Sequence, residues 1–192
     1  MSLSTTLENK YVNGYCVDDV HGLIESVETD PANAMTQWRV ASHWQGGARS
    51  RAQVDGFGMG GAQISRPFAM VIDEPLQLGG TDLHANPQEY LLAALNACMM
   101  VGFSALCALH GLEIESLEVV TEGDIDLRGF LGLDPSISPG YDSLKTTMTV
   151  QGPASAQAYL NIHEMVLATS PNVHNITRPV TLNSNLVVAS AI

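Results

Sequence analysis

The sequence has few basic residues: 8 of its 192 residues are Lys or Arg, against 20 Asp or Glu, and the formal net charge is −12. Nucleic acids and anionic membrane surfaces are bound mainly through Lys and Arg side chains. The composition therefore predicts that the partner is neither a nucleic acid nor a membrane.

Cysteine is also scarce, with single residues at positions 16, 98 and 107. Three cysteines do not make a disulfide framework, and they suit a reducing compartment. The opening stretch, MSLSTTLENKYVNG, contains no apolar run of the kind that a signal peptide needs. We therefore expect a cytoplasmic protein.

Motifs for cofactors and metals are missing as well. The six histidines, at positions 21, 43, 84, 110, 163 and 174, show no metal-ligand spacing. The glycine-rich run GFGMGG at 56–61 lacks the Lys-Ser/Thr pair and the strand-to-helix setting of a phosphate-binding loop. The sequence thus predicts no metal and no cofactor.

Hydrophobic residues are abundant, at 45% of the chain, and their longest run follows Asn86. Asn86 is a suitable N-cap, Pro87 fits the first helical position, and Glu89 can reach back to the cap. Gly111 marks the end of the run. The sequence therefore predicts a long helix over 86–111.

A helix that is apolar nearly all round has to be buried. Its uncharged length would also suit a membrane span, but it contains Asn96 and Ser104 and lacks flanking Lys or Arg. We therefore expect a core helix. Because this helix has more surface than a small sheet can cover, we also expect a homodimer that buries it from both sides.

Shorter patterns complete the chain. Two more helices are predicted, an amphipathic one over 14–29 and a broadly apolar one over 155–169. Strands are predicted over 37–44, 49–57, 68–72, 114–127, 144–150 and 180–188. Pro and Gly punctuate the loops 73–85 and 128–141. This order of elements indicates an α+β domain.

Cys98 lies near the centre of the long helix. A thiol reacts as the thiolate and needs a nearby cation or donor, whereas cysteines in the middle of a helix are often buried and inert. Both readings are open for Cys98. Cys107 follows about 180° round the helix and about 13 Å along it. The two sulfurs of one chain cannot form a disulfide, and we expect Cys107 to be structural.

Several separated motifs resemble the OsmC/Ohr family. They are NPxEYLLAALxAC ending at Cys98, GDIDLRGFLGLD at 123–134 with PGY at 139–141, and SPN at 170–172 before RPV at 178–180. DEPLQLGG, at 73–80, is similar to one OsmC-like branch. We therefore expect an OsmC-like domain over residues 36–192, preceded by an N-terminal extension, residues 1–35, that carries the short amphipathic helix.

The resemblance implies an intertwined homodimer in which antiparallel sheets surround two long central helices. In the peroxidase members, the cysteine matching Cys98 attacks a hydroperoxide and becomes a sulfenic acid. A second cysteine, at the end of the second helix, condenses with it to a disulfide, which a small reductant resets. An arginine from an early turn and a glutamate at the start of the first long helix organise the thiolate.

This chain departs from that pattern at two positions. Ser170 stands where the second cysteine would fall, and a hydroxyl cannot resolve a sulfenic acid. Gln88 stands in place of the glutamate, and Glu89 lies about 100° further round the helix, where it serves either the helix cap or the thiolate. The arginine corresponds to Arg49 or Arg51, for which an exposed place on a strand is the alternative.

Two functions follow from these features. In the first, Cys98 reduces an organic hydroperoxide and an external thiol resets it. In the second, the fold binds a small hydrophobic ligand without turnover.

The residues expected to line the dimer pocket around Cys98 are Ala94, Leu95, Gly102, Gln88, Ser170 and His174. Within this set, the resemblance places Ser170 near Cys98. His174 follows Ser170 closely and offers the one plausible thiol–imidazole pair.

Overall fold

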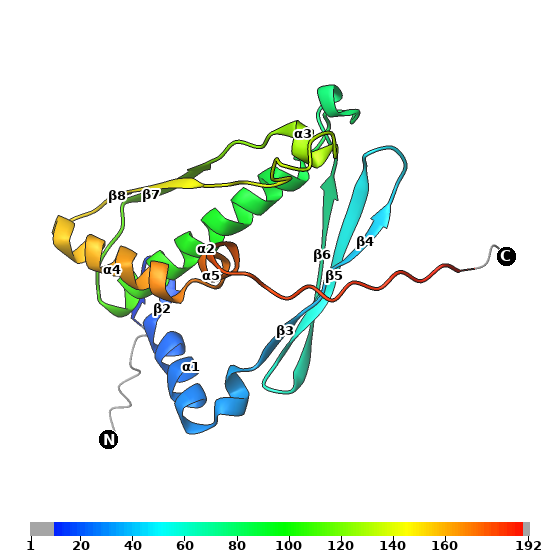
Figure 1. The fold of residues 1–192 in the computed structure, drawn as a ribbon. Helices are drawn as coiled ribbons and strands as arrows, with labels where there is room; N and C mark the ends of the chain where they lie inside the picture. The colour runs from blue at the N-terminus through cyan, green and yellow to red at the C-terminus, as the bar shows by residue number, and fades with distance from the viewer. Residues whose placement is uncertain (1–9, 190–192) are drawn as a thin grey trace, which may run out of the picture.

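A computed structural model describes residues 10–189 of the protein (Figure 1). Its helices are α1 (Val17–Thr29), η1 (Pro31–Ala34), η2 (Leu76–Leu78), α2 (Pro87–Leu109), α3 (Leu127–Phe130), α4 (Ala156–Thr169) and α5 (Pro171–Thr177). Its strands are β1 (Tyr11–Val12), β2 (Tyr15–Cys16), β3 (Thr36–Trp38), β4 (Ala41–Trp44), β5 (Ser50–Met59), β6 (Ala62–Ile72), β7 (Ser116–Glu122) and β8 (Lys145–Gln151). Every strand pair is antiparallel, so the predicted α+β class is confirmed.

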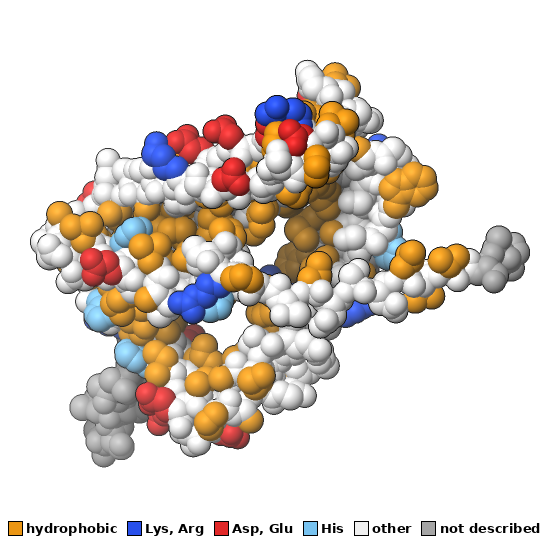
Figure 2. All heavy atoms as spheres, in the orientation of Figure 1, with side chains coloured by type: hydrophobic (Ala, Val, Ile, Leu, Met, Phe, Trp, Pro, Cys, Tyr) orange, Lys and Arg blue, Asp and Glu red, His pale blue; other side chains and the backbone are white. Residues whose placement is uncertain are grey.

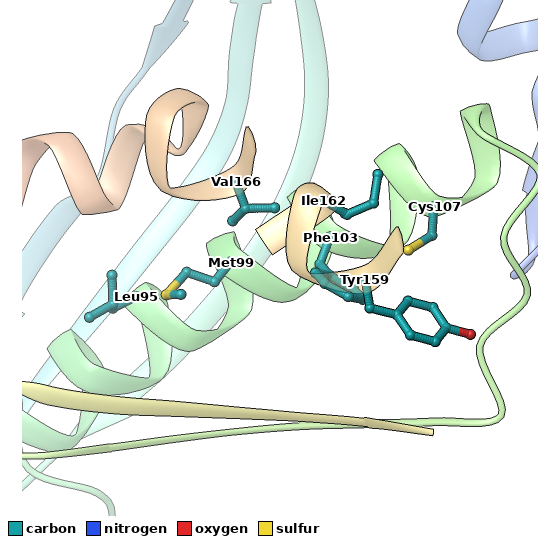
Figure 3. Packing of buried hydrophobic residues seen from close by; sticks show 7 residues of the cluster. All are labelled: Leu95, Met99, Phe103, Cys107, Tyr159, Ile162 and Val166. Atoms are coloured by element: carbon teal, nitrogen blue, oxygen red, sulfur yellow. The ribbon is translucent and has the colours of Figure 1, made fainter. Parts of the chain in front are cut away.

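Helices α2 and α4 pack together alongside the β7–β8 hairpin and form the helical lobe (Figure 1). One stripe of α2 is buried, and we call it the inner face of α2: Leu95, Met99, Phe103 and Cys107. Figure 3 shows this stripe facing three residues of α4: Tyr159, Ile162 and Val166. Because a spacing of four residues returns a side chain to nearly the same side of a helix, this stripe forms a continuous core.

Strand β5 is the centre of a four-stranded sheet. It pairs with β6 on one edge and with β3 and β4 in turn on the other. The β5–β6 register shifts between Val54 and Gly56. A Cβ added at Gly56 would collide with the Ile64 carbonyl of β6. The Tyr90 hydroxyl of α2 donates to the Val71 carbonyl at 2.9 Å and ties this sheet to the helical lobe.

The β1–β2 hairpin lies against the C-terminal end of α2. Asn13, with φ of 52°, and the glycine after it form the tight turn between β1 and β2. The Asn13 side chain donates to the Leu112 carbonyl at 2.8 Å and accepts from the Ile114 N–H at 2.9 Å. The hydroxyls of Tyr15 and Ser104 share a further bond of 3.2 Å.

The long helix and the helix over 155–169 are confirmed, and the amphipathic helix begins at Val17. The strand expected over 37–44 is interrupted after Trp38. The strand expected over 114–127 covers only Ser116–Glu122, and the Asp126 side chain accepts the Arg128 N–H at the start of α3.

The strand predicted over 180–188 is wrong for the single chain. These residues are extended but lie outside every sheet, and Leu182 and Val188 are 86% and 84% exposed. Figure 1 shows the segment running from α5 away from the helical lobe. A strand exists only where a neighbour accepts its backbone hydrogen bonds, and none is present in the described chain.

Helix α2 is long and apolar enough to cross a membrane by length and composition, a test that core helices also pass. Only 28% of its most apolar window is buried within the chain. A second stripe of α2, which we call the outer face of α2, carries Leu91, Ala94, Cys98 and Val101. Its two largest apolar residues are exposed, Leu91 at 44% and Val101 at 60%.

Candidate functional site

Cys98 lies half-buried on the outer face of α2, within hydrogen-bond distance of the Ser170 side chain. The Ser170 hydroxyl donates to the Cys98 sulfur at 3.3 Å. Ser170, the residue expected in place of a second cysteine, is thus in contact with Cys98.

Ser170 is fixed because two helices meet at it. Its N–H donates to the Val166 carbonyl at 2.8 Å and closes α4, while its hydroxyl oxygen accepts the Val173 N–H at 3.5 Å and caps α5. The Asn172 side chain then donates to the Ala94 carbonyl at 2.8 Å, which holds α5 against α2. The sequence analysis missed α5, although a serine followed by proline is a typical helix start.

The other two thiols do not share this setting. Cys107 is fully buried on the inner face of α2, and desolvation raises the pKa of its thiol to about 11. Cys16 is buried at the end of β2. Cys98 is therefore the one cysteine of the three that is not classed as buried.

The Glu89 carboxylate completes the helix cap. It accepts the Asn86 N–H at 2.7 Å, and the Asn86 side chain accepts the Glu89 N–H at 2.8 Å. This confirms the capping box, the first of the two roles considered for Glu89. Gln88 is exposed on the same turn. Within residues 10–189, neither side chain has a recorded hydrogen bond to Cys98.

The two candidate arginines lie in the four-stranded sheet. Arg49 is half-buried in the turn before β5, and Arg51 is exposed on β5, opposite His43 of β4 and Val71 of β6. In the described part of the chain, neither side chain forms an ion pair. Within the described residues, the hydrogen bond recorded for the Cys98 sulfur comes from Ser170 and from neither of these arginines.

The expected pocket residues divide between surface and core. Ala94 and His174 are exposed, Leu95 belongs to the core, and Gly102 faces the Val166 methyl groups. One groove, of about 920 Å³, has a lining that includes Phe103, Tyr159, His163 and residues 146–152. Cys98 does not line it, and the dimer pocket expected around Cys98 stays a prediction.

A comparison with protein families assigns the chain. The profile described as OsmC-like protein matches residues 80–185, which is more than half of the 192 residues. The chain belongs to the OsmC-like family.

Solved structures share the OsmC-like fold. An OsmC-like protein from Mycoplasma pneumoniae is 15% identical, with a TM-score of 0.58, over 73% of this chain and 87% of that one. An OsmC-like protein of unknown function from Vibrio cholerae is 14% identical, with a TM-score of 0.52, over 72% and 92%. A proposed osmotic stress induced and detoxification response protein from Psychrobacter arcticus is 14% identical, with a TM-score of 0.52, over 70% and 84%. No curated protein matched the chain.

This OsmC-like chain has one organising residue that sequence reasoning missed. Asp73 is fully buried and accepts hydrogen bonds from the Thr81 hydroxyl and from the N–H groups of Thr81 and Leu83. The Thr81 hydroxyl is the main reason that the pKa of Asp73 falls to about 2. The carboxylate closes the loop between β6 and α2. A carboxylate placed directly between a strand and a Pro/Gly-rich loop was the available signal.

Over residues 10–189, no group of three or more His, Cys, Asp or Glu side chains is placed to hold a metal ion.

Proposed function

We propose that this protein is a thiol-dependent redox protein in which Cys98 reduces an organic hydroperoxide in a one-cysteine cycle. The observation that carries the proposal is the contact between the Cys98 sulfur and the Ser170 hydroxyl at 3.3 Å. The contact puts a hydrogen-bond donor beside a half-buried thiol. The donor is a hydroxyl, which cannot form a disulfide with Cys98.

The cycle has three balanced steps. The Cys98 thiolate attacks the terminal peroxide oxygen of ROOH and the O–O bond breaks; with one proton, the products are the sulfenic acid and ROH. An external thiol, R′SH, then condenses with the sulfenic acid to a mixed disulfide and releases water. A second R′SH attacks the mixed disulfide, which frees the Cys98 thiol and leaves R′SSR′. No step requires a second protein cysteine.

The name of one solved relative is consistent with this class of function. The Psychrobacter arcticus protein is described as a proposed osmotic stress induced and detoxification response protein. At 14% identity it shares the fold, and a stress-related role for the present chain belongs to our proposal. A cytoplasmic location, where external thiols are abundant, is part of the same proposal.

We also propose that the working unit is a homodimer. The chain exposes 14249 Å² of surface, whereas the size scaling gives about 8,900 Å² for a compact monomer of this 20.5 kDa mass. Figure 2 shows openings between the helical lobe and the sheet, bordered by hydrophobic side chains. The outer face of α2 and the extended segment 180–188 supply apolar surface for a second copy to cover.

The dimer proposal is tested by Val101→Asp, which puts a charge on the outer face of α2. Wild-type protein is expected to have twice the 20.5 kDa chain mass by light scattering, and the variant the mass of one chain. Glu118→Ala, a change at an exposed position of β7, is the control and should leave the mass unchanged. A wild-type mass of one chain at micromolar concentration contradicts the proposal.

The alternative function is non-catalytic binding of a small hydrophobic ligand. One observation favours it: in the described chain, the recorded partner of the Cys98 sulfur is the neutral Ser170 hydroxyl and no cation. A thiol without a nearby cation has less help in ionising. If Arg49 or Arg51 completes the site, it does so in the assembled dimer, and Arg49→Ala or Arg51→Ala should then slow Cys98 oxidation.

Intact-protein mass spectrometry after one equivalent of cumene hydroperoxide separates the two functions. A fast gain of one oxygen that a small thiol removes, absent from Cys98→Ser, is expected for the peroxidase. Hydrogen peroxide serves as the comparison oxidant. If Cys98 oxidises no faster than a thiol of the unfolded chain, the redox proposal fails and ligand binding becomes the working hypothesis.

A further inference from the structure

We infer that the Ser170 hydroxyl is the hydrogen-bond donor that favours the anionic form of the Cys98 sulfur. This deepens the proposed redox function and rests on it. The resemblance would place a cysteine at position 170, where this chain has serine. The inference assigns a role to the hydroxyl of that serine.

The direction of the hydrogen bonds supports this task. The Val173 N–H donates to the Ser170 oxygen at 3.5 Å, so the oxygen already acts as an acceptor on the side of α5. The hydroxyl proton is then free to point toward the Cys98 sulfur, 3.3 Å away. A charged acceptor makes a stronger hydrogen bond than a neutral one, so this donor stabilises the thiolate more than the thiol.

Burial makes the donor effective. Ser170 is only 6% exposed, so its hydroxyl has little access to water as an alternative acceptor. A buried hydroxyl that loses its partner costs free energy, which favours keeping the bond to sulfur. The backbone cannot easily move the group away, because Ser170 closes α4 and starts α5, and Asn172 fastens α5 to the Ala94 carbonyl.

A hydroxyl at this position differs from a thiol in two ways. It is the stronger hydrogen-bond donor, since S–H donates only weakly. It also cannot form a disulfide, so the sulfenic acid on Cys98 remains available to an external thiol. Ser170 thus supports the first step of the proposed cycle and leaves the second step to the external reductant.

The competing explanation is that Ser170 is only a helix cap. The chain offers a matched control for this, because Ser155 caps α4 in the same way, with its hydroxyl accepting the Ala158 N–H at 3.3 Å. Ser155→Ala and Ser170→Ala each remove one cap hydroxyl. Only Ser170→Ala removes the recorded donor to the Cys98 sulfur.

The test is the rate of Cys98 alkylation by iodoacetamide as a function of pH, followed by peptide mapping. In Ser170→Ala the alkylation of Cys98 near neutral pH should be about tenfold slower than in wild type. Ser155→Ala should keep the wild-type profile despite a similar loss of thermal stability. Ser170→Thr, which restores a hydroxyl, should return the profile toward wild type.

Identical profiles for wild type and Ser170→Ala overturn the inference and leave Ser170 as a cap. Should Ser170→Ala not fold, Ser170→Cys under reducing conditions replaces it, and an unchanged profile has the same meaning there. The hydroperoxide experiment is read separately. A shifted profile without oxidation of Cys98 contradicts the peroxidase proposal, whereas oxidation with an unshifted profile contradicts only the role of Ser170.

Discussion

The two faces of α2 place the same residue type in opposite environments. On the inner face, Cys107 is fully buried among residues of α2 and α4, and its thiol has a pKa raised to about 11. On the outer face, Cys98 is half-buried and accepts a hydrogen bond from Ser170. Helix type and residue type are constant between the two positions, so the neighbours alone separate an inert thiol from a candidate nucleophile.

The two faces of α2 also differ in which parts of the protein cover them. The inner face is covered within one chain by α4 and the β7–β8 hairpin. The outer face receives α5 near Ala94 but leaves Leu91 and Val101 exposed. The inner face therefore supplies stability to the single subunit, and we propose that the outer face requires a second subunit before the site is complete.

The largest expected effect is the loss of inner-face packing in Phe103→Ala. Phe103 is 1% exposed and lies against Tyr159, with ring centroids 6.2 Å apart. Removing a buried Phe side chain should lower the free energy of unfolding by about 3–5 kcal/mol, measured by urea titration. Val101→Ala should cost much less, with a cost that grows with protein concentration if a second copy covers it. Equal losses for the two variants at every concentration would contradict the contrast between the faces.

The next effect is selectivity in alkylation. With a pKa of about 11 against an ordinary value of 9.0, Cys107 has roughly one hundredth of the usual thiolate fraction at pH 8. Native protein treated with iodoacetamide should therefore carry the label on Cys98, with Cys107 reacting at least about 100-fold more slowly. Both should react at similar rates in urea. Rapid native labelling of Cys107 would show that the inner face opens.

Stability at alkaline pH should report the same burial. Because the folded-state pKa of Cys107 is raised, its contribution is fully present below pH 9 and is lost as pH rises toward about 11. Wild-type stability should fall by up to about 2–3 kcal/mol more over this window than that of Cys107→Ala, by urea titration at each pH. Parallel curves for the two proteins would mean that Cys107 ionises equally in both states.

The smallest effect is expected on the outer face, at Asn172. Asn172→Ala removes its hydrogen bond to the Ala94 carbonyl and should cost about 1 kcal/mol in thermal unfolding. Because α5 also positions Ser170, Cys98 alkylation should become slower in this variant. Thr177→Ala, which removes another side-chain bond of α5, is the control and should not affect Cys98. An unchanged rate of Cys98 alkylation in Asn172→Ala would show that the hydrogen bond between Asn172 and the Ala94 carbonyl does not influence Cys98.

The sequence by itself determined the local parts of this protein. Asn86, Pro87 and Glu89 specify the start of α2 through backbone hydrogen bonds within one turn. The alternation in β8 and the apolar periodicity of α4 likewise follow from side-chain patterns, which depend on neighbours a few residues away. These elements, together with the separated motifs, were sufficient to predict the OsmC-like α+β fold.

The tertiary structure decided which of these residues meet. Only packing brings Ser170 to 3.3 Å from Cys98, 72 positions earlier in the chain, and buries Asp73 beneath its loop. It also leaves segment 180–188 without a strand partner, although the sequence pattern there is typical of a strand. Such contacts depend on how helices and sheets approach one another, because short-range periodicity carries no information about partners that are distant in sequence.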